Sequence, residues 1–221
     1  INFFGFESLI RENKIVVLNM NIARYKNLSK IIAAYLKLDF QSEVLIQLSN
    51  KKTISPTVFM CDEYHEYVTL SDSDFFAQSR EAKCINIVAT QSYTSLLNTL
   101  HDQSAVNVII QNLINKLWFR SDDIFTIENA QKQIGKEDKE KISRGISENA
   151  KETVYSYFTN SLNSKNSNIS ETITTTLQND FVYDTNFFTR HLTNFHCLSF
   201  LSTGTEIIPP SELKLFPYFN N

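Results

Sequence analysis

Three short apolar runs mark the first half of the chain. They span Lys14–Met20, Thr57–Cys61 and Cys84–Thr90, and each is nearly continuous rather than alternating. Uninterrupted apolar runs of this length are typical of strands covered on both faces in a parallel sheet. These runs therefore predict three buried strands.

Residues with helical spacing lie between these runs. Apolar residues recur at intervals of three and four from Leu28 to Leu48, and both Asp72–Lys83 and Ser104–Asn115 can be helical. Lys116–Arg120 predicts a fourth strand. The order strand, helix, strand between residues 57 and 90 fits a βαβ crossover. The predicted fold class is α/β, with a mostly parallel sheet and helices on both faces.

The character of the sequence changes after Ser121. Residues 122–151 are charged and helix-prone, and residues 155–176 consist mainly of Ser, Thr and Asn, which indicates a polar surface excursion that is partly mobile. Apolar structure returns with a predicted strand at Phe195–Leu201, before a proline-punctuated, extended tail. We therefore expect one domain with an α/β core (1–120), a polar excursion (121–180) and a closing strand with its tail (181–221).

Composition narrows the functional classes. The 221 residues include 21 Lys and Arg against 24 Asp and Glu, so no net basic field indicates nucleic acid and any such contact must be local. The three cysteines, Cys61, Cys84 and Cys197, lie in apolar runs and are predicted to be reduced core thiols. No run is long enough to cross a bilayer. Because the sequence starts at Ile1, we expect it to be part of a longer protein whose membrane anchor would lie upstream.

An acid pair follows the second apolar run directly. In parallel α/β proteins the ligand crevice lies beyond the carboxyl ends of the strands. A carboxylate there can hold Mg²⁺ through water, and a second one can activate an attacking water molecule. On this interpretation Asp62 is the metal-side acid and Glu63 the general base. The alternative is that Asp62 caps a turn and Glu63 is solvated.

Other polar residues extend this hypothesis. Gln91 ends the neighbouring strand at the same sheet edge, where a neutral amide can sense a terminal phosphate or orient water. Arg80 precedes that strand and lies at the opposite edge, so it could act only on a neighbouring subunit's site in trans, with Lys83 as a second candidate. On the sequence alone, an ordinary surface arginine is the favoured interpretation of Arg80. His65 lies close to the acid pair and could tune it, or be an exposed loop residue.

One expected feature is missing from the sequence. The phosphate loop G-x-x-x-x-G-K followed by Ser or Thr does not occur, and the chain has only 4 glycines. A loop that wraps phosphates in backbone N–H groups needs such residues. We therefore do not expect this chain alone to bind a nucleotide tightly or to be active.

The order of motifs resembles a known family. The run T-V-F-M-C-D-E-Y, then S-R-E-A-K, then C-I-N-I-V-A-T-Q-S-Y and finally K-L-W-F-R is similar to the C-terminal half of the motor domain of type IV coupling proteins, the TraG/TraD family of conjugation and type IV secretion. The opening F-E-S-L-I-R-E-N-K-I-V-V-L-N-M looks like the strand that resumes this domain after an inserted all-α domain.

The resemblance implies a RecA-like ATPase that uses ATP and Mg²⁺ and forms a hexameric ring with copies of itself at the cytoplasmic face of the bacterial inner membrane. Such rings pass single-stranded DNA, relaxosome proteins or secreted proteins to the components of a secretion channel. Asp62 and Glu63 match the family's Walker B acids, Gln91 its glutamine after the next strand, and Arg80 its basic residue before that strand. The phosphate loop, the all-α domain and the membrane helices would precede Ile1 in the parent.

A second function from a different class stays open. The Ser/Thr/Asn-rich stretch and the proline-punctuated tail could recognise a partner protein. The chain would then be a non-catalytic α/β docking module of a secretion or conjugation complex.

Overall fold

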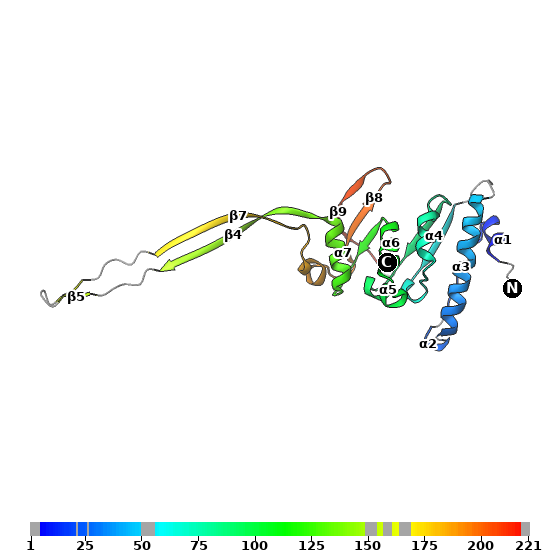
Figure 1. Cartoon of the computed structure of the whole chain (residues 1–221), viewed down its shortest axis with the longest axis horizontal. Coiled ribbons are helices and arrows are strands. Elements are labelled where there is room, and N and C mark those ends of the chain that lie inside the picture. Colours follow the sequence, from blue (N-terminus) through cyan, green and yellow to red (C-terminus); the bar gives the residue numbers. More distant parts are fainter. Residues whose placement is uncertain are drawn as a thin grey trace. The chain divides into compact units, whose positions relative to one another are not determined.

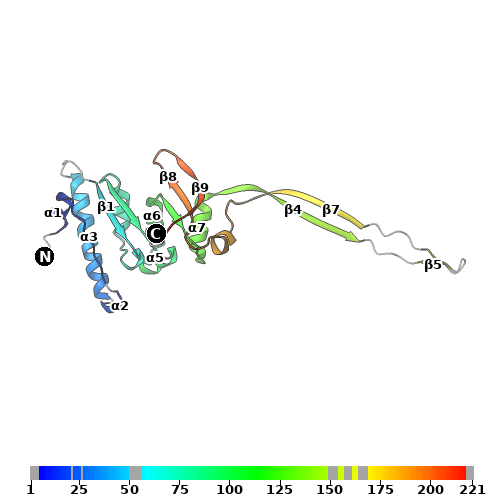
Figure 2. The same cartoon turned by 180° about the vertical axis from the view of Figure 1, so that it is seen from behind.

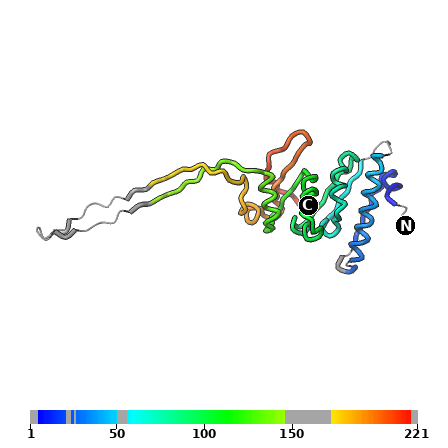
Figure 3. Tube along the Cα trace, viewed as in Figure 1, coloured from blue at the N-terminus to red at the C-terminus, as the bar shows by residue number. Residues whose placement is uncertain are grey.

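The computed structural model describes residues 5–20, 22–25, 27–49, 56–148, 154–156, 161–163 and 169–217. The chain separates into two compact units, one made of residues 1–130 with 185–221 and the other of residues 131–184. Figures 1 and 2 show the elements from opposite sides, and Figure 3 traces the backbone. Parts of the predicted polar excursion and the last four residues of the tail lie outside the described residues.

Two parallel strands form the centre of the first unit. β1 (Thr57–Cys61) pairs with β2 (Cys84–Val88) in the register Thr57↔Cys84 to Cys61↔Val88, so the two apolar runs are confirmed as strands. One face of the pair, which includes Phe59, contacts the hydrophobic core. The other face carries four apolar side chains that are exposed, namely Val58, Met60, Ile85 and Ile87.

Helices pack on the buried face. The described residues form the helices α1 (Phe6–Arg11), α2 (Ile22–Tyr25), α3 (Asn27–Ser49), α4 (Asp72–Ser79), α5 (Tyr93–Leu100), α6 (Gln103–Asn112) and α7 (Ile124–Ile134), a 3₁₀ turn at Tyr64–Glu66 and a π-helical turn at Phe187–His191. The core takes Val44 from α3, Phe76 from α4, Leu96 from α5 and Ile109 from α6. The predicted helices in 28–48, 72–83 and 104–115 are therefore present.

The helix α3 buries a different face from the one that its apolar spacing indicates. Its buried residues are Ser29, Ala33, Lys37, Gln41 and Val44, at intervals of four and three. Apolar side chains of the same helix are exposed, among them Leu28, Ile31 and Tyr35. A lysine and a glutamine can occupy a buried stripe only if their polar atoms find partners there.

Asp72 supplies those partners. Its carboxylate is fully buried and accepts hydrogen bonds from Lys37 Nζ (2.5 Å), Gln41 Nε2 (3.0 Å) and Tyr64 Oη (2.6 Å). The backbone N–H of Thr69 also donates to Asp72, at 3.0 Å. We call these five residues the Asp72 network. It joins α3, the 3₁₀ turn and the start of α4.

Burial shifts the pKa values of two groups in the Asp72 network. Burial lowers the pKa of Lys37, and the charge of Asp72 and its hydrogen bond oppose that shift. Burial, together with the Asp72 charge, raises the pKa of the Tyr64 hydroxyl, so this group stays protonated and donates. The ammonium and the carboxylate depend on each other, because neither has bulk water around it.

A second sheet completes the first unit. β3 (Lys116–Trp118), β8 (His196–Ser202) and β9 (Ile207–Lys214) lie in the order β3-β8-β9, and both pairings are antiparallel. The predicted fourth strand and closing strand therefore exist, but they pair with each other rather than extending a parallel ladder. The register shifts between Ser199 and Leu201, opposite Pro209 and Pro210, which have no N–H to donate.

The second unit is a long antiparallel ribbon. β4 (Lys136–Glu148) pairs with β7 (Ile169–Phe181) over their full lengths, and the short strands β5 (Val154–Ser156) and β6 (Ser161–Asn163) also pair. Gly135, with φ +99°, ends α7, and its carbonyl accepts the N–H of Val182 at 3.3 Å. The expectation of helix for 136–148 is wrong, because β7, which is rich in β-branched Thr, offers this segment a complete ladder of backbone partners.

The prediction of a strand at Lys14–Met20 is also wrong. This segment is irregular, and its Ile15 and Val17 side chains are 92% and 83% exposed. A continuous apolar run becomes a buried strand only where neighbouring strands and covering layers are present. The fold class itself is confirmed as α/β, although helices cover only one face of the β1–β2 pair in the described residues.

We predict that Lys37→Met destabilises the protein by about 3–5 kcal/mol, because it leaves the buried Asp72 carboxylate without its cation. Urea unfolding measures the change. The matched control is Lys30→Met on the same helix, which removes a partly exposed ion pair with Glu66 and should cost about 1 kcal/mol or less. Equal losses from the two variants would contradict a structural role for the Asp72 network.

Candidate functional site

The carboxyl ends of β1 and β2 lie side by side. The N–H of Ala89 donates to the carbonyl of Cys61 at 2.9 Å, and the N–H of Tyr64 donates to the carbonyl of Ala89 at 2.8 Å. These bonds continue the ladder beyond the two strands. The residues that come after each strand, Asp62 and Glu63 on one and Gln91 on the other, are therefore brought together at one sheet edge.

Glu63 and Gln91 are in direct contact. Gln91 Nε2 lies 3.3 Å from Glu63 Oε1 and 3.2 Å from Oε2, so the amide donates to the carboxylate. Asp62 joins them around a shallow, open cavity of about 140 Å³, which Ala89 and Thr90 also line. We call Asp62, Glu63 and Gln91 the acid–amide site.

The backbone at Glu63 has an unusual conformation. Its φ of 47° and ψ of 44° lie in the left-handed region, where a residue other than glycine is uncommon. The N–H of Glu63 donates to Asp62 Oδ1 at 2.9 Å, and its carbonyl accepts from Glu66 at 2.9 Å. The next residue is Tyr64, which the Asp72 network holds. Strained backbone of this kind persists where the surroundings fix it, and it is frequent at functional sites.

The segment after Gln91 has its own anchor. Asp123 accepts from Thr94 Oγ1 at 2.5 Å and from Thr126 Oγ1 at 2.5 Å, and Thr126 in turn accepts the N–H of Tyr93 at 2.9 Å. Burial by itself raises the pKa of Asp123, but hydrogen bonds from Thr126 and Thr94 outweigh burial, and the pKa lies below its ordinary value. The start of α5 is thereby tied to the start of α7.

Arg80 does not join the acid–amide site. It is exposed at the end of α4, just before β2, and so lies at the opposite end of that strand from Gln91. Lys83 is exposed in the same turn, with φ +53°. Neither side chain reaches its own chain's acid pair, which agrees with the expected placement and leaves any role in trans as a proposal.

The donor set fits a magnesium ion only together with other ligands. Asp62 offers hard carboxylate oxygens at the cavity, the type that Mg²⁺ prefers. Within the residues that the structure describes, no group of three or more His, Cys, Asp or Glu side chains could hold a metal ion. Phosphate oxygens and water would have to complete the coordination sphere. The cysteines are free, and burial raises the pKa of Cys61 to about 11, so this thiol stays protonated.

The sequence did not reveal the two clusters that support the acid–amide site, the Asp72 network and the hydrogen bonds around Asp123. Lys37 and Gln41 look like solvent-facing helix residues, and Asp72 looks like an ordinary residue of a helix start. Asp123 falls in a stretch that resembles a charged loop. No local signal distinguishes these residues, because their partners lie about 30 positions away along the chain.

The fold and this edge define the class of the protein. Parallel strands with acids and an amide at their carboxyl ends, and helices packed against them, make it an α/β protein with a RecA-like fold. Residues 56–180, more than half of the 221, match the family model described as the TraM recognition site of TraD and TraG. The chain therefore belongs to this TraG/TraD family of coupling proteins, of which it represents a C-terminal part.

Solved structures agree with this assignment. The bacterial conjugative coupling protein TrwBdeltaN70, in an unbound monoclinic form, is 11% identical with a TM-score of 0.60, over 96% of this chain and 44% of that one. The plasmid coupling protein TrwB in complex with the non-hydrolysable GTP analogue GDPNP is 10% identical with a TM-score of 0.53, over 88% of this chain and 37% of that one. This chain thus spans less than half the length of either. At sequence identities this low, the structural similarity establishes the fold alone.

No curated protein gives a significant match to the sequence. Among the described residues, none of the helices combines the length and the apolar character that a membrane crossing requires.

We predict a specific pH dependence for Asp123. Because its folded-state pKa is lowered, the unfolded chain binds more protons, so its contribution is present above the unfolded value of about 3.9 and is lost as the pH falls through the folded value. The difference in free energy of unfolding between wild type and Asp123→Asn should be constant above about pH 5 and shrink toward about pH 3. Urea unfolding across this range measures it, with Asp122→Asn as the exposed neighbouring control. A difference that grows as the pH falls would contradict the assignment.

Proposed function

We propose that this chain is the Walker B and sensor part of a coupling protein that hydrolyses ATP and drives transfer of a substrate in conjugation or type IV secretion. The observation that carries the proposal is the contact between Glu63 and Gln91 beside Asp62, at the carboxyl ends of two adjacent parallel strands. Membership of the coupling-protein family and a nucleotide analogue bound to the similar TrwB support it.

Each residue of the acid–amide site has a part in this mechanism. Glu63 accepts a proton from the attacking water as general base. Gln91 keeps the carboxylate oriented through its amide and, when a nucleotide is present, can turn the same amide toward the terminal phosphate. Asp62 would hold Mg²⁺, which when bound would supply positive charge to offset that of the phosphate oxygens. The phosphate loop has to come from other parts of the parent protein.

Arg80 fits a role between subunits. Its position at the far end of β2 separates it from its own chain's acids, and a guanidinium offered to a neighbouring copy stabilises charge that develops on the transferred phosphoryl group. This arrangement requires a ring of copies, for which we propose a hexamer.

We also propose the surroundings in which the ring works. The family model's description as a TraM recognition site points to a relaxosome protein as a partner. Single-stranded DNA or secreted proteins are the proposed cargo, and channel components of the secretion system receive it. An anchor upstream in the parent would place the ring at the cytoplasmic face of the inner membrane. The exposed ribbon of β4 and β7 favours a docking role in addition to the motor role.

We predict that Glu63→Gln in the complete parent protein abolishes ATP hydrolysis while ATP binding is kept, because the amide preserves shape but cannot accept the proton. Steady-state ATPase assays with and without single-stranded DNA, together with nucleotide-binding titrations, measure the two properties. Glu81→Gln, an exposed acid in the turn before β2, is the matched control and should hydrolyse ATP like the wild type. Normal turnover in Glu63→Gln would remove this residue from the mechanism.

A mixing experiment tests Arg80. Arg80→Ala and Glu63→Gln parents should each be inactive alone, whereas mixed rings should regain partial ATPase activity. In such rings an intact Glu63 site on one subunit meets an intact Arg80 from the other variant. The same mixing experiment with Lys83→Asn in place of Arg80→Ala tests whether Lys83, rather than Arg80, acts in trans. Asn suits the left-handed backbone at that position. Absence of recovery in rings shown to be mixed would exclude action in trans.

A further inference from the structure

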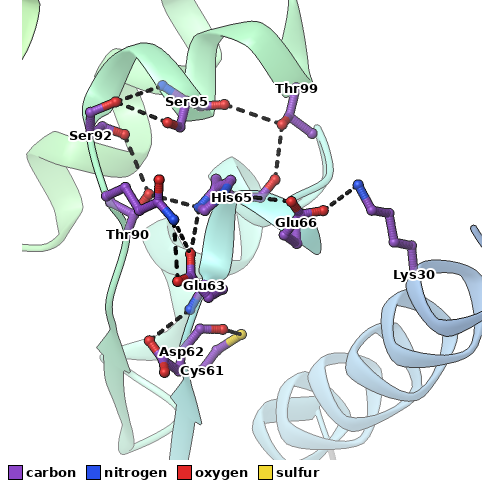
Figure 4. Close-up of polar contacts among 11 residues, drawn as sticks. Lys30, Cys61, Asp62, Glu63, His65, Glu66, Thr90, Ser92, Ser95 and Thr99 are labelled. Carbon is purple, nitrogen blue, oxygen red and sulfur yellow. Dashed lines mark hydrogen bonds and ion pairs between the residues drawn. The ribbon is translucent and has the colours of Figure 1, made fainter. Parts of the chain in front are cut away.

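A chain of polar contacts leads from Glu63 away from the acid–amide site to the helix α3. Figure 4 shows His65 between Glu63 and Glu66, and Lys30 of α3 beyond Glu66. Glu66 forms an ion pair with Lys30. Glu63, His65 and Glu66 all come from the 3₁₀ turn or from the residue before it, so the turn presents three polar side chains in a row.

His65 is held in place on both sides. Its side chain is 14% exposed, and Nδ1 lies 3.5 Å from Glu63 Oε2 and 3.4 Å from Thr90 Oγ1. Its backbone carbonyl accepts a hydrogen bond from Thr99 Oγ1 of α5 at 2.9 Å. On the other side of the ring, Nε2 lies 3.7 Å from Glu66 Oε1, which is beyond hydrogen-bond distance. The ring is therefore packed against the acid–amide site rather than free in a loop.

The neighbours of His65 Nδ1 indicate which ring nitrogen carries the hydrogen. Thr90 Oγ1 can donate its proton to the carbonyl of Ser92 at 3.3 Å, and it then faces the ring with a lone pair. The ionised Glu63 carboxylate can only accept. In this arrangement both neighbours of Nδ1 are acceptors, and Nδ1 carries the hydrogen. His65 Nδ1 then faces Glu63 Oε2, which Gln91 also contacts, across 3.5 Å, a close polar contact rather than a hydrogen bond.

We propose that His65 is a positioning residue for Glu63. It keeps one oxygen of the carboxylate in place when Gln91 turns away toward a phosphate, and the hydrogen bond from Thr99 to the His65 carbonyl keeps the imidazole beside Glu63. The inference rests on the proposed function, since it assigns His65 a part in activating the water that Glu63 deprotonates. Without His65, a Glu63 carboxylate that Gln91 has left would have no neighbouring side chain to hold it and would sample unproductive rotamers.

The test compares two isosteric replacements in the parent protein. The amide of Asn reaches the position of Nδ1 and that of Gln the position of Nε2. We expect His65→Ala to lower kcat of ATP hydrolysis about tenfold with KM for ATP within about twofold, and His65→Asn to restore most of that loss. His65→Gln, which cannot reach Glu63 from the same position, should resemble His65→Ala. His101→Asn, an exposed histidine at the end of α5, is the control and should leave kcat unchanged.

The outcomes separate this inference from the proposed function. A wild-type parent without ATPase activity, or an active Glu63→Gln variant, would overturn the function itself. An active wild type and an inactive Glu63→Gln, with His65→Ala at wild-type kcat, would overturn only the positioning role. A His65→Gln that works as well as His65→Asn, or losses that follow the melting temperature rather than the isostere, would reduce His65 to a packing residue and also overturn it.

Discussion

A carboxylate without contact with solvent connects the parts of the first unit. Asp72 receives hydrogen bonds from α3, from the 3₁₀ turn and from the backbone before α4, and Lys37 is its counter-ion. Because an unpaired charge in this place would cost several kcal/mol, these elements can pack only in the arrangement that brings all donors together. Tyr64, one of the donors, is the residue directly after Glu63, so the same network fixes the backbone that presents the proposed base.

The central strands could be predicted from the sequence because their signal is local. Runs such as Thr57–Cys61 are apolar at nearly every position, and a polar residue marks the end of each, so both the strands and their shared edge can be inferred from residue type and order. The same reasoning failed at Lys14–Met20, where the composition is equally apolar but no strand forms. It also failed at 136–148, where the charged residues predicted a helix. This segment forms a strand because it pairs along its whole length with the Thr-rich β7.

The acid–amide site was predictable for the same reason, and its supports were not. Asp62 and Gln91 stand out because each is a polar residue just past the end of an apolar strand, and parallel pairing then brings them together. Lys37 and Asp123 have no such marker, because their structural roles depend on hydrogen-bond partners that are distant in sequence. His65 is intermediate: proximity to the acids is visible in the sequence, whereas its contact with Thr90 depends on the pairing of β1 and β2.

The two prolines of β9 have a consequence for association between molecules. β9 is the outermost strand of its sheet among the described residues, and an outer strand offers unpaired backbone groups to any extended chain nearby. Pro209 and Pro210 remove two consecutive donors where the register shifts, so an incoming strand cannot continue a ladder past this point. The β9 edge of the sheet is thereby protected against edge-to-edge growth.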